Sequence, residues 1–108
     1  MKKNTNVSKI IKVNATKDQI IAVLEKLDWE IGYDSKFYYI NEPVYDDSDY
    51  VIGEATIAVY PQKNSFKITV DKKDYPKGHM WEAKYDLDRY IEYLSEEILL
   101  FKQSIISH

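Results

Sequence analysis

The chain has 108 residues, of which 44% are hydrophobic and 31% charged, with a formal net charge of -3 and only three glycines and three prolines. This balance predicts one folded domain and excludes both wholesale disorder and a cofactor domain joined to a substrate domain. Without cysteine the chain has no disulfide, thiolate metal site or cysteine nucleophile, and without an apolar run of roughly 18 residues we expect a cytoplasmic protein.

The first expected elements are a strand and a helix. Residues 9–13, KIIKV, are rich in β-branched side chains and favour a strand, and residues 1–7 should form a disordered tail. Thr16 and Gln19 have the T-x-x-Q pattern of a capping box, which predicts a helix over about 17–28. The apolar residues of this helix recur at helical spacing and define one buried face: Ile20, Val23, Leu24 and Leu27.

Four strands should follow this helix. After residue 28 the apolar period changes to two, and a turn signal at Asp34 and Ser35 predicts a hairpin that ends with KFYYI, residues 36–40. The run YVIGEATIAVY, residues 50–60, predicts the longest strand, with five residues on one face: Val51, Gly53, Ala55, Ile57 and Val59. The alternation in SFKITVD, residues 65–71, predicts a half-exposed antiparallel strand.

A long helix should close the chain, from about Met80 to Ile106. Its apolar residues recur every three or four positions and form one seam: Leu87, Ile91, Leu94, Ile98, Phe101 and Ile105. The seam should pack on the sheet, and pairing with a second copy in a homodimer is the alternative. The predicted order is therefore β-α-β-β-β-β-α, an α+β two-layer sandwich with an antiparallel sheet and the long helix packed on it.

The stretch NEPVYDDSDYVIGE, residues 41–54, has five carboxylates, two tyrosines and no Lys or Arg. Counting an EF-hand loop from Asp46 or Asp47 leaves no glycine at position six and no acid at position twelve, so we expect no metal site. A solvated acidic loop does not shift carboxyl pKa values as catalysis requires, and the chain has no catalytic or phosphate-binding motif. We therefore expect a protein that is not an enzyme and has no catalytic residue and no cofactor.

The same stretch suggests a surface for a basic partner protein. Tyrosine offers rigid contact area with one polar handle, and acidic side chains steer a basic partner. The candidate partner-binding residues are Glu42, Tyr45, Asp46, Asp47, Asp49 and Tyr50. The leading hypothesis is a small interaction module, and above all a stoichiometric inhibitor of the immunity type or the phage-encoded anti-defence type. Its expected partner is a basic protein such as a nucleic-acid-processing enzyme, with no direct contact to nucleic acid or membrane, and the lysine-, isoleucine-, asparagine- and tyrosine-rich usage suggests a bacterial or phage genome.

Two segments resemble known families. Residues 7–24, VSKIIKVNATKDQIIAVL, are similar to the opening of helix-grip (START-like) domains, which implies a long C-terminal helix that closes a curved sheet over an apolar ligand pocket. The residues that would line such a pocket are Trp29, Phe37, Tyr39, Trp81 and Tyr85. Residues 79–94, HMWEAKYDLDRYIEYL, resemble the last helix of double-stranded-RNA-binding domains, which implies RNA binding. Few lysines lie near this acidic helix, and the chain is short for a helix-grip domain, so RNA binding and ligand binding rank behind the partner-binding hypothesis.

Overall fold

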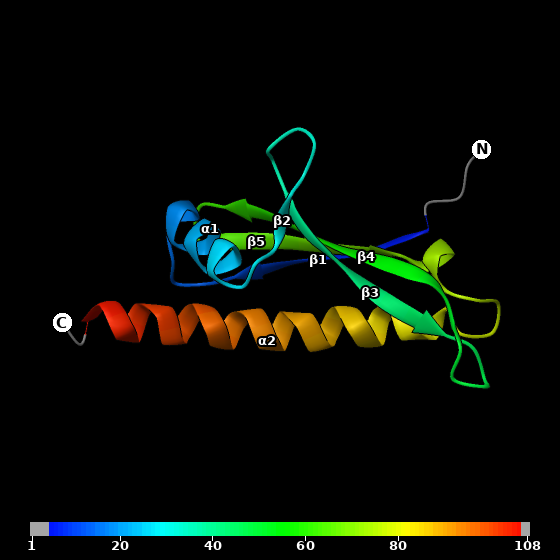
Figure 1. The fold of residues 1–108 in the computed structure, drawn as a ribbon. Coiled ribbons are helices and arrows are strands. Elements are labelled where there is room, and N and C mark those ends of the chain that lie inside the picture. Colours follow the sequence, from blue (N-terminus) through cyan, green and yellow to red (C-terminus); the bar gives the residue numbers. More distant parts are fainter. Residues whose placement is uncertain (1–4, 107–108) are drawn as a thin grey trace.

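The structure, a computed structural model, describes residues 5–106, of which 105 and 106 are described in backbone only. The strands are β1 (Asn6–Lys12), β2 (Glu30–Ile31), β3 (Tyr38–Tyr45), β4 (Val51–Gln62) and β5 (Ser65–Asp71), and the helices are α1 (Lys17–Lys26), the short 3-10 turn η1 (Lys72–Asp74) and α2 (Trp81–Ile106). All strand pairs are antiparallel, and the five strands lie in the order β1-β5-β4-β3-β2. Figure 1 shows the sheet as one layer with α2 running along one of its faces. The predicted α+β sandwich and element order are confirmed.

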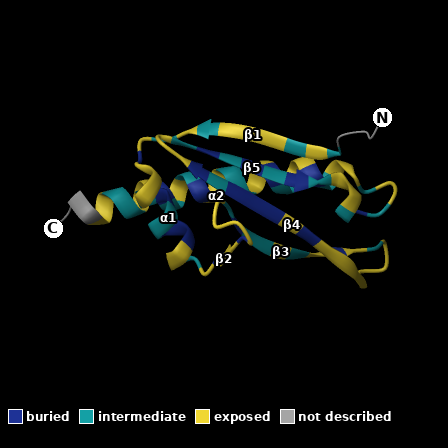
Figure 2. Ribbon diagram, turned by 90° about the horizontal axis from the view of Figure 1, so that it is seen from above, coloured by how far each residue is buried: buried dark blue, intermediate teal, exposed yellow. Residues whose placement is uncertain are grey.

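The sheet has one buried face and one open face. Ile57 pairs with Val70 and Val59 with Ile68 across β4 and β5, and all four side chains are buried. Lys67 and Thr69 alternate with these buried residues along β5, point away from the helices and stay partly exposed. Figure 2 views the open face, with α2 behind the sheet. The core therefore lies between the sheet and the two helices.

The capping box predicted at the start of α1 is present. Thr16 Oγ1 accepts a hydrogen bond of 3.1 Å from the Gln19 N–H, and Gln19 Oε1 accepts one of 3.0 Å from the Thr16 N–H. Two backbone donors at the helix start are satisfied in this way. The helix buries Ile20, Val23 and Leu24 against the core, as their spacing predicts.

The apolar seam of α2 packs within the chain. Leu87, Leu94 and Ile98 are buried, and Ile91 and Phe101 are partly buried against the same core. The predicted packing of this helix on the sheet is therefore confirmed, while the side chain of Ile105 lies outside the described residues. Leu99 and Leu100 remain exposed on another side of α2. A homodimer through this helix stays a prediction.

Three parts of the sheet differ from the sequence analysis. Residues 6 and 7, predicted as part of a tail, belong to β1 and pair with Asp71 and Val70, whereas residues 1–4 of that tail lie outside the described residues. The acidic stretch is mostly strand rather than loop, because β3 continues to Tyr45 and only residues 46–50 connect it to β4. Pairing with β4 and burial of Val44 stabilise this extension. Of the five residues predicted on one face of β4, Ala55, Ile57 and Val59 are buried. Val51 and Gly53, next to the register shift at the end of the hairpin, are exposed.

Candidate partner-binding site

The loop between β3 and β4 is shaped by Asp46. Its Oδ1 atom accepts hydrogen bonds from the Ser48 N–H at 2.8 Å and from the Tyr50 N–H at 3.1 Å. The Asp46 N–H in turn donates to the Tyr50 carbonyl at 3.0 Å. Asp side chains commonly close turns in this way. Asp46, a candidate partner-binding residue, therefore has a structural role inside the loop.

The other loop residues present their side chains to solvent. Asp49 has φ 65, in the left-handed region that Asp tolerates better than most residues, and its N–H donates to the Asp46 carbonyl at 3.1 Å. Tyr50 is 71% exposed, and Tyr45, at the end of β3, is also exposed. The two predicted tyrosine anchors thus lie on the surface on either side of one acidic turn.

His79 joins this loop to the start of α2. Its Nε2 lies 2.8 Å from Asp47 Oδ1, and its Nδ1 lies 2.8 Å from Glu82 Oε2. An imidazole with a carboxylate at each nitrogen is best satisfied when both nitrogens carry a proton. The hydrogen bond to Glu82, followed by the negative charge of Asp47, raises the pKa of His79 above its ordinary 6.5. The sequence analysis did not include His79 or Glu82 in the site.

The raised pKa of His79 makes stability depend on pH in a defined direction. Protonated His79 is favoured in the folded state, so its contribution should be complete below pH 6.5 and should disappear as the pH rises through the raised folded pKa. We expect the stability difference between wild type and His79→Gln, measured by urea unfolding across pH 5–9, to shrink over that window. A His79 pKa at or below 6.5, measured by NMR titration of the folded protein, would contradict this linkage.

A second polar cluster lies between β3 and α2. Arg89 Nη2 is 3.7 Å from Glu42 Oε1 and 3.3 Å from Asp86 Oδ1. The hydroxyl of the buried Tyr75 donates to Asp86 Oδ2 at 2.7 Å. Burial, and then this hydrogen bond, raise the pKa of Tyr75 well above its ordinary 10.0, so its hydroxyl stays protonated as a donor. Glu42, a candidate partner-binding residue, therefore forms an ion pair with α2.

Two hollows lie next to each other between β3 and α2, and we call them together the β3–α2 groove. Its acidic part has a volume of about 310 Å³ and is lined among others by Glu42, Tyr45, Tyr75, Glu82, Asp86 and Arg89. Its apolar part has a volume of about 350 Å³ and is lined by Leu27, Trp29, Ile40, Arg89, Tyr90 and Tyr93. Arg89 lines both parts, which makes them neighbours along one side of the molecule.

Exposed aromatic residues of α2 extend the site. Trp81 is 65% exposed and Tyr85 is 62% exposed, four residues apart on the side of the helix away from the core. Because His79 contacts Asp47, the start of α2 lies beside the acidic loop, as Figure 1 shows. Both residues fall outside the apolar seam, and this position indicates that they are exposed. The helix-grip resemblance would instead place them in a ligand pocket.

The five aromatic residues that the helix-grip resemblance would place in one pocket are separated. Trp29 is buried on the helix side of the sheet, where Tyr90 packs edge-on at 5.9 Å. Phe37 and Tyr39 pack together at 6.1 Å on the open face of the sheet, with Tyr33 and Tyr60 around Phe37. Trp81 and Tyr85 lie exposed on α2. The five therefore line no common cavity.

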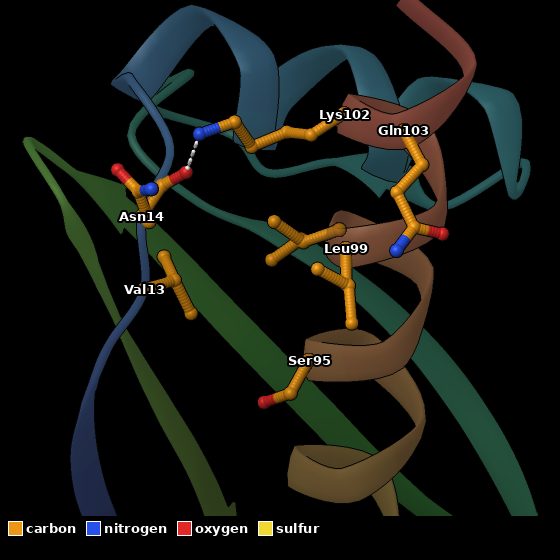
Figure 3. A pocket seen from close by; sticks show the side chains of 7 residues that line it. Val13, Asn14, Ser95, Leu99, Lys102 and Gln103 are labelled. Carbon is orange, nitrogen blue, oxygen red and sulfur yellow. Dashed lines mark hydrogen bonds between the residues drawn. The ribbon is translucent and has the colours of Figure 1, made fainter. Parts of the chain in front are cut away.

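An apolar hollow is present instead at the other end of α2, with a volume of about 360 Å³. Figure 3 shows Leu99 and Val13 facing each other across it, and Lys102 donating a hydrogen bond to the Asn14 carbonyl. It contains no residue of the predicted pocket and no candidate partner-binding residue.

The charges of α2 bear on the RNA-binding alternative. The helix contains six carboxylates against three basic residues, Lys84, Arg89 and Lys102. Arg89 is paired with two carboxylates, and Lys102 with a backbone carbonyl. Phosphate binding needs several cations on one face, which the side chains of α2 over residues 81–104 do not provide.

No protein-family model matches the chain, and no curated protein or solved structure is significantly similar to it. Over residues 5–106, no group of three His, Asp or Glu side chains is arranged to hold a metal ion. Within the same part of the chain, no helix is long and apolar enough to cross a membrane. The site must therefore be interpreted from its own geometry.

Proposed function

We propose that this protein is a small interaction module that acts as a stoichiometric inhibitor. It binds a basic protein through the surface formed by the acidic β3–β4 loop and the start of α2. The surface consists of the loop at residues 46–50, the exposed tyrosines that flank it, the exposed Glu54 opposite Pro43 on β4 and the first turns of α2. It combines aromatic contact area with carboxylates, the pairing that suits a positively charged partner.

The observation that carries this proposal is the double attachment of the acidic loop. Asp46 closes the turn from inside, and Asp47 ties it to His79 at the start of α2. A loop that is already ordered loses less conformational entropy on binding than a mobile one. These contacts hold the loop in one conformation with Asp49 and Tyr50 exposed to a partner. Such an ordered surface favours tight binding by an inhibitor.

The chemistry of the surface indicates the class of partner. Enzymes that act on nucleic acids have basic clefts, and an acidic protein surface competes for such a cleft by the same long-range attraction that steers the substrate. Immunity proteins and phage-encoded anti-defence proteins are inhibitors of this physical type. A bacterial or phage source is consistent with the lysine- and isoleucine-rich composition.

Capture from bacterial lysate with matched charge variants tests the proposal. The site variant Asp49→Asn/Glu54→Lys and the control variant Asp18→Asn/Glu30→Lys change the net charge equally, and all four native side chains are exposed. We expect wild type and the control to retain a basic protein that the site variant loses at low salt. With the purified partner, association of the site variant should be about tenfold slower at low salt, and the difference should shrink at high salt.

Functional inhibition provides the second part of this test. Titration of the partner's activity should reach its end point at equimolar protein. If both variants captured the same proteins, or if the captured protein kept its activity at saturation, the proposed function would be wrong.

A further inference from the structure

One edge of the sheet is open beside the β3–α2 groove. Within the described residues, β2 pairs only with Tyr38 and Tyr39, and no strand pairs with Asn41–Tyr45 on that side. The Phe37 carbonyl accepts from the Gly32 N–H at 2.8 Å, which shows that odd-numbered residues of β3 direct their backbone groups to this edge. Asn41 and Pro43 therefore present theirs to solvent. Tyr45 does so as well beyond the register shift, because the next residue, Asp46, directs its N–H to Tyr50 on the β4 side.

Pro43 fits this arrangement, since proline lacks an N–H and is tolerated in strands mainly at an edge. It also limits what the edge can accept. Asn41 and Tyr45 each offer a donor and an acceptor, whereas Pro43 offers a carbonyl alone. A short extended segment can satisfy this pattern, while a long unspecific sheet extension is disfavoured.

The groove beside the edge sets the side chains that such a segment should carry. Ile40 and Glu42, two residues apart, both point to the helix side of β3. Ile40 lines the apolar part of the groove and Glu42 lines the acidic part. Side chains of an added strand alternate in the same way, with two residues advancing about 6.8 Å. An apolar residue opposite Ile40 and a basic residue two positions away would enter the two parts together.

The charges at the acidic part favour a basic side chain. Three carboxylates line it, Glu42, Glu82 and Asp86, against the single cation Arg89, and a protonated His79 outside the lining pairs with Glu82. The same excess disfavours a second copy of this chain at the edge, because pairing of two β3 edges would bring two acidic grooves together.

We propose that the β3–α2 groove binds an extended segment of the basic partner, which adds to the edge of β3 and places an apolar and a basic side chain, two residues apart, in the groove. The segment forms backbone hydrogen bonds with Asn41 and Tyr45, and the side-chain pair provides specificity. This inference rests on the proposed function and names the mode of recognition.

Selection from a displayed library of random ten-residue peptides tests the inference on the intact chain. We expect enriched peptides to contain an apolar residue and an Arg or Lys at i and i+2, and to shift the backbone amide NMR signals of residues 41–45. N-methylation of the peptide amides that face β3 should weaken binding at least about tenfold, whereas methylation of the alternating amides should leave it unchanged. Glu42→Gln should weaken the basic peptides but not their Arg→Ala versions.

Other outcomes would overturn the inference. These are failure to enrich peptides, binding that tolerates methylation at every amide, shifts confined to residues outside the groove, or a dimer in sedimentation experiments that peptide addition dissociates. This test uses the purified chain and peptides alone, without a partner from lysate. A negative result would therefore contradict this mode of binding without contradicting the proposed function. Capture that depends on Asp49 and Glu54 but ignores Glu42→Gln would leave the function standing without this mode of binding.

Discussion

Replacing Leu87 with alanine should lower the free energy of unfolding by about 2–5 kcal/mol, because the side chain is fully buried between α2 and the sheet. The loss combines the transfer energy of the deleted atoms with the cavity that they leave. Urea denaturation of the purified variant measures it directly. The midpoint should shift while the slope stays constant.

Leu99→Ala is the matched control on the same helix. Leu99 is 56% exposed, so this change should alter stability by less than about 0.5 kcal/mol in a monomer. A large loss at Leu99 that depends on protein concentration, with a small loss at Leu87, would show that the helix serves mainly as a dimer interface. The intramolecular packing of the seam would then be a minor part of its role.

Replacing Tyr50 with alanine should accelerate dissociation from the basic partner by about 10- to 100-fold, as expected for an aromatic anchor at the centre of an interface. The loop should keep its shape, because the Tyr50 contacts with Asp46 are made by backbone groups. Surface plasmon resonance at two salt concentrations would separate this change in dissociation rate from electrostatic effects on the association rate. The association rate should change much less than the dissociation rate.

Tyr33→Ala is the matched tyrosine control, since Tyr33 is 94% exposed and packs on Phe37 at the open face of the sheet. It should bind like wild type. Equal losses of binding affinity for Tyr33→Ala and Tyr50→Ala would indicate that the partner contacts the open face of the sheet. Unchanged dissociation at Tyr50 would remove this residue from the binding site even if the charged residues remained in it.

Elements with a strong local signal were predicted closely. The capping box at Thr16 predicted the start of α1, and the three- and four-residue spacing of Leu87, Ile91, Leu94 and Ile98 predicted the face of α2 that packs on the core. Both signals depend on residues less than two turns apart, where helical geometry decides which side chains share a face. The alternation in β5 is also a local signal, because successive side chains of a strand point to opposite faces of the sheet.

Features that depend on distant partners were not predicted. The extension of β3 to Tyr45 follows from its pairing with β4, which outweighs the low strand preference of Asn41 and Pro43. The contacts of Asp47 with His79 and of Glu42 with Arg89 join segments separated along the chain, and no local pattern marks such pairs. The acidic residues were thus identified from composition, whereas their fixed positions required the fold.

The pairing of β1 with β5 predicts an order of folding. Strands β3, β4 and β5 follow one another with short connections, so this meander can form from local contacts. In contrast, Asn6 pairs with Asp71, and this contact closes a loop that contains α1 and the other three strands. Such non-local pairings slow folding because chain entropy is lost before the contacts form. The first strand of the sequence is therefore expected to be the last to join the sheet, and the acidic hairpin belongs to the part that forms early.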